Sequence, residues 1–387
     1  MYKNNHAPFK FDIVGSFLRP DYLKEAREQL KKGDITEEQL RKVEDQAIQE
    51  LIDKQKKAGL PVITDGEFRR SWWHLDFMWG LQGVEKLEVT QGYTFHDEVT
   101  RGESAGLCGK ISGENHPFIE HFKYVKLFED SSVLARQTIP APAQFLAELE
   151  RGDNLEKTRA WYPDEEALLQ DIAAAYRQVI KDLYDAGCRN VQFDDCTWGM
   201  FCDTKYWEAR QKGETSIEDL AARYVRVNNL AIEGHPEDLT ITTHVCRGNY
   251  HSTWASAGGY APIAPYLFDQ ENVSAYYLEF DDERSGDFEP LKYVSSNKQV
   301  VLGLVTTKKP ELEAKDAVVR RIREASQYVP LERLCLSPQC GFASTEEGNK
   351  LTEEEEWNKL RLIKEISEEV WGQTVCLLYT SDAADDG

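Results

Sequence analysis

One pattern recurs along this chain and constrains its fold more than any other feature: an amphipathic helical segment, a glycine, then a short apolar run that ends in polar residues. In the first instance, residues 36–39 (Thr-Glu-Glu-Gln) match a capping box, and apolar residues at helical spacing follow them. Gly59 then provides a helix stop, and residues 61–64 have the character of a buried strand that leads into Asp65-Gly-Glu67. Each such unit places one helix beside one strand.

Later segments of the chain repeat this order. Predicted helices cover residues 164–185, 216–232, 313–328 and 353–370. Predicted strands cover residues 11–14, 61–64, 190–193, 239–244, 275–279, 300–306 and 334–337. Strands that alternate with helices and end in polar groups are typical of a parallel architecture. We therefore predict an α/β fold, a TIM-like (β/α)8 barrel; an open doubly wound sheet is the alternative, but no glycine-rich phosphate loop supports it.

Residues 91–142 interrupt the alternation, because they are richer in β-forming residues, Gly and His. We predict that they form a β-rich insertion over the barrel. No low-complexity linker or repeat requires a second domain, so residues 1–375 are predicted to form a single barrel domain. Residues 376–387 (CLLYTSDAADDG) look like translated sequencing adapter, and we expect them not to be native.

The composition argues against several classes of partner. The net charge is -22 at pH 7, which would repel the phosphates of nucleic acids and anionic membranes. No apolar run approaches the roughly 20 residues that span a bilayer, and the first nine residues lack a signal-peptide pattern. We therefore expect a cytoplasmic protein with small-molecule substrates, whose assembly into homo-oligomers stays open. Eight cysteines in such a chain indicate thiol chemistry more than disulfides.

Two of these cysteines lie where zinc-binding groups would meet. His244 and Cys246 end a predicted strand, and residues i and i+2 of a strand point to the same side. Imidazole and thiolate are both zinc ligands. Glu279 ends the next predicted strand, where a buried carboxylate is costly without a cation or hydrogen-bond partners, and Cys340 follows another. If these strands share one end of a barrel, the four residues form a zinc site.

The order of the motifs resembles the catalytic barrel of cobalamin-independent methionine synthase, and specifically the short single-barrel members of that family. The resemblance extends from Val14 to about Trp371. The motifs that carry it are Val14-Gly-Ser16, Asp65-Gly-Glu67-Phe-Arg-Arg70, Val191-Gln-Phe-Asp194, His244-Val-Cys246, Glu279 and Ser337-Pro-Gln-Cys-Gly341. The resemblance implies a methyltransferase that converts homocysteine to methionine.

The resemblance also implies roles for individual residues. It assigns Zn2+ binding to four of them: His244, Cys246, Glu279 and Cys340. A bound zinc ion keeps a thiol as a nucleophilic thiolate. Ser16 would bind homocysteine through its backbone and hydroxyl, while Glu67 and Asp194 would receive the ammonium group. We assign catalytic roles to Asp194 and to Glu279, the latter as a metal ligand that yields to the substrate sulfur.

The methyl donor is less well defined by the sequence. An aromatic cluster after Glu67 is a candidate to stack against the donor, with core packing as the alternative; it comprises Trp72, Trp73, His74, Phe77 and Trp79. Lys110 and His116 are candidate contacts to an anionic donor.

The chain departs from the family pattern at two places that affect this assignment. Thr306 stands where the family has a histidine proposed to protonate the departing folate, and threonine is not a general acid near pH 7. Asp195-Cys196 replaces the more usual Glu-Pro, and no segment corresponds to the second, N-terminal barrel of full-length members.

These departures leave the donor open between methyltetrahydrofolate and another donor such as a methylcorrinoid. Two other hypotheses for the function remain. One is a corrinoid- or other-thiol methyltransferase of the uroporphyrinogen-decarboxylase-like superfamily, and the other is a non-catalytic zinc- or thiol-binding protein.

Overall fold

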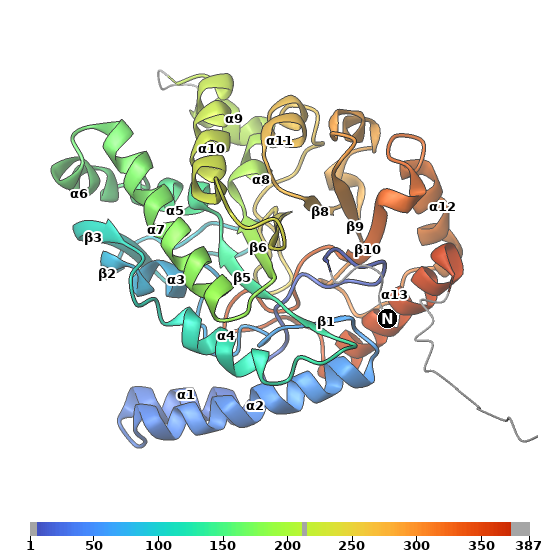
Figure 1. Ribbon diagram of the computed structural model, residues 1–387, viewed down its shortest axis with the longest axis horizontal. Coiled ribbons are helices and arrows are strands. Elements are labelled where there is room, and N and C mark those ends of the chain that lie inside the picture. Colours follow the sequence, from blue (N-terminus) through green and yellow to red (C-terminus); the bar gives the residue numbers. More distant parts are fainter. Residues whose placement is uncertain (1–5, 211–214, 373–387) are drawn as a thin grey trace, which may run out of the picture.

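A parallel sheet lies at the centre of the computed structural model, which describes residues 6–210 and 215–372 (Figure 1). Six strands are hydrogen-bonded in the order β10-β9-β8-β7-β6-β5, and every neighbouring pair is parallel. Their bounds are β5 Gln137–Pro140, β6 Asn190–Asp195, β7 Thr240–Val245, β8 Ala275–Glu279, β9 Gln299–Val305 and β10 Leu334–Pro338. The predicted α/β class with a parallel sheet is confirmed.

The eight-stranded ring predicted from the sequence is not completed by paired strands within the described residues. The short strands β1 (Val62–Ile63) and β4 (Leu134–Ala135) form a separate parallel pair. The predicted strand at residues 11–14 makes only an isolated bridge from Phe11 to Leu336 of β10. Here the Asp12 carboxylate accepts the backbone N–H groups of Phe9 and Ile13, so these two amides do not extend a strand ladder.

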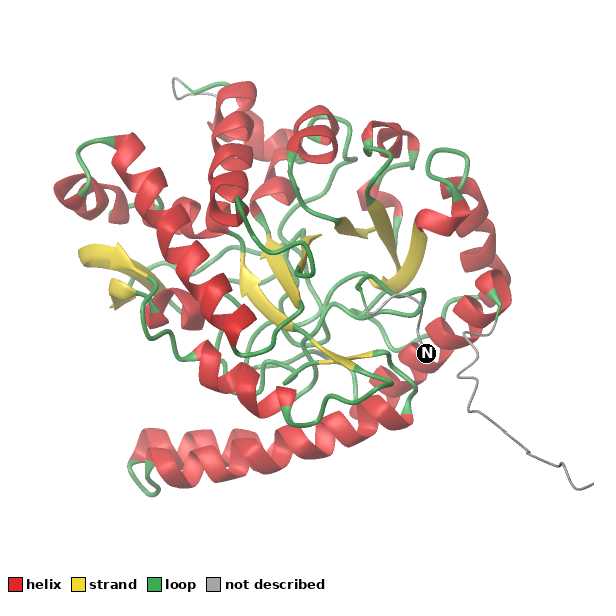
Figure 2. Cartoon of the chain, viewed as in Figure 1, coloured by secondary structure: helices red, strands yellow, loops and turns green. Residues whose placement is uncertain are grey.

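Helices surround the parallel sheet, whose strands lie in the middle of the molecule (Figure 2). The structure has α1 Asp21–Lys32, α2 Glu37–Lys57, α3 Leu75–Gly80, α4 Phe118–Lys126, α5 Pro142–Leu149, α6 Asn154–Trp161, α7 Glu165–Asp185, α8 Thr197–Phe201, α9 Thr204–Arg210, α10 Ile217–Ile232, α11 Ala264–Gln270, α12 Lys315–Ala325 and α13 Glu353–Trp371. The predicted capping box before α2 is present, since the side chains of Thr36 and Gln39 each accept from the other residue's backbone N–H. Within the described residues, no helix combines the length and apolar character needed to cross a membrane.

An antiparallel hairpin extends beyond the parallel sheet. It consists of β2 (Gln82–Glu88) and β3 (Glu103–Ser112). This hairpin begins before the segment 91–142 that we predicted as an insertion, and β5, near the end of that segment, belongs to the central sheet. The predicted adapter-derived tail, residues 376–387, lies outside the described residues.

Candidate metal and thiol-binding site

The four predicted metal ligands come together in the folded chain. His244 belongs to β7 and Cys246 follows it directly, Glu279 ends β8, and Cys340 follows β10. One potential ligand atom from each lies within 4.8 Å of the others, and all four residues are buried. We call these four residues the ligand set. Because parallel strands end at the same edge of a sheet, side chains far apart in sequence converge there.

The orientation of each donor atom fits a zinc ion. Nδ1 of His244 lies 3.2 Å from the carbonyl oxygen of Tyr277, and a hydrogen bond there leaves Nε2 as the free donor atom. That Nε2 is buried and has no hydrogen-bond partner in the described part of the chain. The sulfur atoms of Cys246 and Cys340 are 3.8 Å apart. Two thiolates bound to tetrahedral zinc at about 2.3 Å would be separated by about the same distance.

Electrostatics also favour a cation at the ligand set. Burial raises the pKa of Glu279 to about 7, against the opposing effect of Lys308, while Oε1 accepts the backbone N–H of Arg247 at 3.0 Å. The pKa of Cys340 is held well above its ordinary value, first by the adjacent Cys246 thiol and then by burial. Two buried thiols and a carboxylate cannot all ionise together without a positive charge beside them. The donor set of one imidazole, two sulfurs and one carboxylate therefore fits zinc.

A pair of buried carboxylates forms a second corner of the site. Glu67 and Asp194, here called the carboxylate pair, line the same cavity as three members of the ligand set, His244, Cys246 and Cys340. Burial raises the pKa of both groups, and the charge of Glu67 raises that of Asp194 further. Arg70 lies 3.4 Å from Oε1 of Glu67, but Oε2 is buried with no hydrogen-bond partner among the described residues. An ammonium group would relieve this repulsion and satisfy the open oxygen.

Local backbone geometry fixes the carboxylate pair. Glu67 has a left-handed backbone conformation, with φ of 63°. Its Oε1 accepts the Thr138 hydroxyl at 3.0 Å. Gln192 donates to Oδ1 of Asp194 at 2.9 Å and to the carbonyl of Val14 at 2.6 Å. Asp194 is thereby tied to the segment that carries Ser16.

Ser16 lies where the N-terminal segment meets the chain after β10. Its hydroxyl accepts the backbone N–H of Ala343 at 3.2 Å, and it lines the cavity. A Cβ atom added at Gly341 would lie 1.9 Å from Oγ of Ser16, so glycine is required for this close approach. The structure thus places Ser16, the carboxylate pair and three members of the ligand set around one cavity, with Glu279 behind them in the same donor group.

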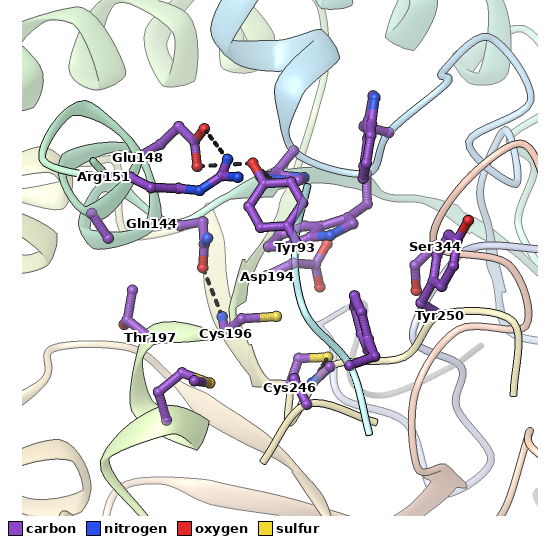
Figure 3. Close-up of a pocket in the computed structure, with 18 of the residues that line it drawn as sticks. Tyr93, Gln144, Glu148, Arg151, Asp194, Cys196, Thr197, Cys246, Tyr250 and Ser344 are labelled. Atoms are coloured by element: carbon purple, nitrogen blue, oxygen red, sulfur yellow. Dashed lines mark hydrogen bonds and ion pairs between the residues drawn. The ribbon is translucent and has the colours of Figure 1, made fainter. Parts of the chain in front are cut away.

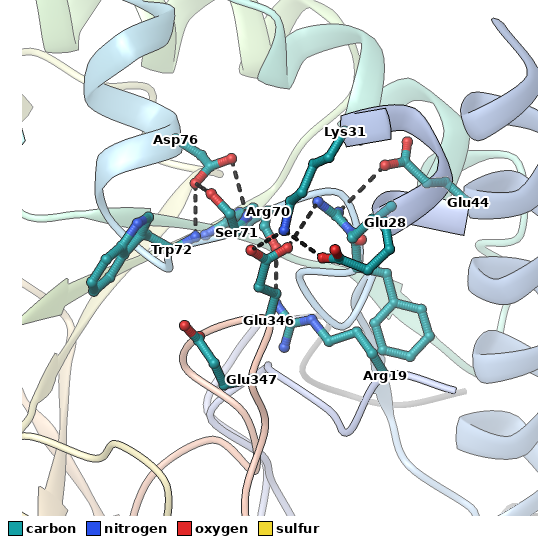
Figure 4. Close-up of polar contacts among 12 residues, drawn as sticks. Arg19, Glu28, Lys31, Glu44, Arg70, Ser71, Trp72, Asp76, Glu346 and Glu347 are labelled. Carbon is teal, nitrogen blue, oxygen red and sulfur yellow. Dashed lines mark hydrogen bonds and ion pairs between the residues drawn. The ribbon is translucent and has the colours of Figure 1, made fainter. Parts of the chain in front are cut away.

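A polar network holds the loop that presents Glu67. The Arg19 guanidinium donates to the carbonyl of Ala343 at 2.6 Å and to that of Glu67 at 2.8 Å. Asp76 accepts the backbone N–H of Ser71 at 3.1 Å and that of Trp72 at 2.7 Å (Figure 4). Since the bonds of Arg19 link segments far apart in sequence, the position of Glu67 depends on the tertiary fold.

The cavity has a volume of about 970 Å3, and several aromatic side chains line it. The aromatic wall comprises Trp72, Trp73, His74, Tyr93 and Tyr250. His74 stacks on Trp73 with ring centroids 4.4 Å apart, and its Nε2 lies 3.0 Å from the Tyr93 hydroxyl, which donates to Glu148 at 2.8 Å. Burial lowers the pKa of His74 to about 3, so the ring is neutral at physiological pH. Figure 3 shows Tyr93, Glu148 and Arg151 across the cavity from Cys246.

Other predicted donor contacts lie outside the cavity lining. Lys110 is exposed on β3 and donates to the carbonyl of Trp161 at 2.8 Å. Both ring nitrogens of His116 are engaged, Nε2 with the carbonyl of Phe77 at 2.8 Å and Nδ1 with the N–H of Phe118 at 3.1 Å. The hydroxyl of Thr306 accepts the backbone N–H of Lys308. The structure brings none of these three predicted or substituted residues to the cavity lining.

Two cavity residues escaped the sequence reasoning. Tyr93 lies in the loop between β2 and β3, and Cys196 directly follows β6. No local pattern marks Tyr93, because it reaches the cavity only through the path of the hairpin. The sequence did contain a signal that could have identified Cys196, because the Asp195-Cys196 pair is one of the places where the chain departs from the family pattern.

Comparison with known proteins agrees with this geometry. The family model for the catalytic domain of the cobalamin-independent synthase matches residues 10–368. The chain belongs to this family.

Individual members of the family align over most of both chains. The uncharacterized protein YxjH of Bacillus subtilis is 45% identical over 370 residues, which cover 95% of this chain and 96% of YxjH. A methionine synthase of Saccharolobus solfataricus is 25% identical over 336 residues, which cover 85% of this chain and 87% of that synthase. A solved structure of a candidate vitamin-B12-independent methionine synthase from Listeria monocytogenes has a TM-score of 0.75 and 39% identity, covering 96% of this chain and 100% of that one.

Proposed function

We propose that this protein is a zinc-dependent methyltransferase that moves a methyl group to the thiolate of homocysteine and forms methionine. The observation that carries the proposal is that three members of the ligand set, His244, Cys246 and Cys340, line the same cavity as the carboxylate pair. A thiol-activating site and an ammonium-binding site on the same cavity suit an amino-acid thiol. Membership of the cobalamin-independent synthase family supports the same reaction class.

Zinc bound by the ligand set would supply a thiolate that stays nucleophilic at neutral pH. The chain's own residues would position the substrate. Glu67 and Asp194 would hold its ammonium group, because both carboxylates are buried and repel each other without a cation. Ser16 would bind the amino-acid moiety through its hydroxyl and backbone. Holding both ends of the substrate fixes the sulfur for in-line attack on the methyl group.

The proposed donor is methyltetrahydrofolate or another methyl donor such as a methylcorrinoid. The aromatic wall offers flat apolar surfaces on which a ring could stack. A proton for the departing carrier would have to come from a group other than Thr306, whose hydroxyl lies outside the cavity lining.

A combined assay tests the proposal. Freshly purified protein would be analysed for metal, then supplied with homocysteine and, in separate reactions, methyltetrahydrofolate as mono- and triglutamate and methylcobalamin. We expect about one zinc ion per chain and methionine from at least one donor. Absence of zinc would overturn the metal assignment. Zinc without methionine from any donor would overturn the homocysteine reaction and leave a zinc- or thiol-binding protein.

A further inference from the structure

We propose that Cys196 is an additional, exchangeable metal ligand that occupies the substrate's position until the substrate thiol arrives. This inference rests on the proposed function and deepens it. It concerns a residue that is not part of the ligand set and that directly follows β6.

Strand register places Cys196 level with Cys246. β6 and β7 are parallel, with Asp194 opposite His244 and Asp195 opposite Val245. Cys196 follows Asp195, and Cys246 follows Val245. The backbone N–H of Cys246 donates to the carbonyl of Asp195 at 2.9 Å. The side chain of Gln144 in α5 accepts the backbone N–H of Cys196 at 3.0 Å.

The two side chains also meet. Cys196 and Cys246 both line the cavity, and their side chains lie next to each other in the view of Figure 3. His244 is 2% exposed, and its Nε2, which has no partner within the described residues, belongs to the same cluster. A third sulfur therefore lies at the edge of a group of donor atoms that already fits a soft cation.

The count of donors explains why one of them must exchange. The ligand set and Cys196 offer five donors, but a tetrahedral zinc site has four positions, so Glu279 takes the fourth position only when neither Cys196 nor the substrate sulfur holds it. Glu279 is 1% exposed, Cys340 4% and Cys246 6%, whereas Cys196 is partly exposed. A substrate that enters through the cavity reaches the position of Cys196 first.

The exchange conserves charge in a buried site. As the substrate sulfur takes the position, Cys196 leaves it, and the proton lost by the substrate thiol is taken by the Cys196 sulfur. One thiolate replaces another, so the net charge of the buried site does not change.

Cobalt substitution tests this assignment without measuring turnover. Thiolate-to-Co2+ absorption reports the number of bound sulfurs, and we expect it to fall by about one third per bound ion in Cys196→Ser, as three thiolates become two. Adding L-homocysteine should leave the wild-type absorption unchanged and raise that of Cys196→Ser by about one half. Cys196→Ala should behave like Cys196→Ser. Cys202→Ser is the matched control, because Cys202 is a buried thiol near α8 that does not line the cavity, and it should match wild type.

The outcomes separate this inference from the proposed function. Equal absorption in wild type and Cys196→Ser, or a rise in wild type on adding homocysteine, would overturn the role of Cys196 while leaving the ligand set in place. Failure of every variant to bind Co2+ would overturn both. Circular dichroism confirms that each variant is folded before the spectra are compared.

Discussion

The two ends of the cavity are built in different ways. At the metal end, the ligand set is carried by residues at or just beyond the ends of β7, β8 and β10, in the central sheet. At the opposite end, the aromatic wall includes Tyr93 from the loop between β2 and β3, and Glu148 and Arg151 lie at the end of α5 and just beyond it. One end is fixed by hydrogen-bonded strands, and the other by the packing of loops and helices.

This difference explains which residues of the site could be predicted from the sequence. Polar residues at consecutive strand ends have to meet once the strands are parallel and adjacent. Lys110 and His116 looked equally suitable by chemistry, yet they lie outside the cavity lining, because their positions depend on how the hairpin folds over the sheet. The metal end should therefore be sensitive to single substitutions, and the donor end more tolerant.

The largest effect is expected at the metal end. Cys340→Ser should weaken zinc binding by more than about 100-fold, because a hydroxyl is a poor substitute for a thiolate ligand. Metal analysis after dialysis against a chelator measures this loss. Cys335→Ser is the control, since Cys335 is buried within β10 beside Tyr277 and Val301 and should keep the metal. Equal retention of zinc in both variants would remove Cys340 from the ligand set.

A smaller effect is expected at the carboxylate pair. Glu67→Gln should weaken homocysteine binding about 10- to 100-fold, because a charged hydrogen bond is worth about 1.5–3 kcal/mol. Zinc content should not change. Titration calorimetry gives the affinity, and Glu44→Gln is the control, since Glu44 is buried between Arg27 and Arg69 away from the cavity lining. Unchanged affinity in Glu67→Gln would contradict the proposal that the carboxylate pair binds the substrate ammonium.

The donor end should respond more weakly still. Tyr93→Phe removes the hydroxyl that links His74 to Glu148, and we expect the KM for the methyl donor to rise about 2- to 10-fold. Steady-state kinetics at saturating homocysteine would measure it. Lys110→Ala should leave that KM unchanged, as its side chain lies outside the cavity lining. A larger effect for Lys110→Ala than for Tyr93→Phe would contradict the structure's account of this end.

The smallest effect on the site itself is expected from a buried cluster behind β6, whose titration should change stability and not metal or substrate binding. Asn228 lies 3.4 Å from Glu271 and 3.4 Å from Asp195, and burial raises the pKa of Glu271 from 4.5 to about 8. Between these pH values the folded state holds a proton that the unfolded chain has lost, so the free energy of unfolding should decrease as pH rises through this window. Urea unfolding at several pH values should show a flatter profile for Glu271→Gln. An identical slope in the variant would exclude Glu271 as the titrating group.

The sequence by itself determined the alternation of helices and strands and the identity of the ligand set. Local patterns suffice for the helices, as the Thr36 capping box before α2 shows. The spacing of His244 and Cys246, with Glu279 and Cys340 after later strands, marked the candidates, and the resemblance to the family assigned them to zinc; parallel pairing of the strands then brings them together.

Only the tertiary structure decided the remaining features. The fully buried ion pair of Arg136 and Asp12, at 2.9 Å, joins residues 124 positions apart and has no local signal. The placement of Cys196 beside Cys246 depends on the register between β6 and β7, and the contact of Tyr93 with His74 on the path of a loop. Register and loop path are set by the packing of the whole chain, so neighbouring residues in the sequence do not encode them.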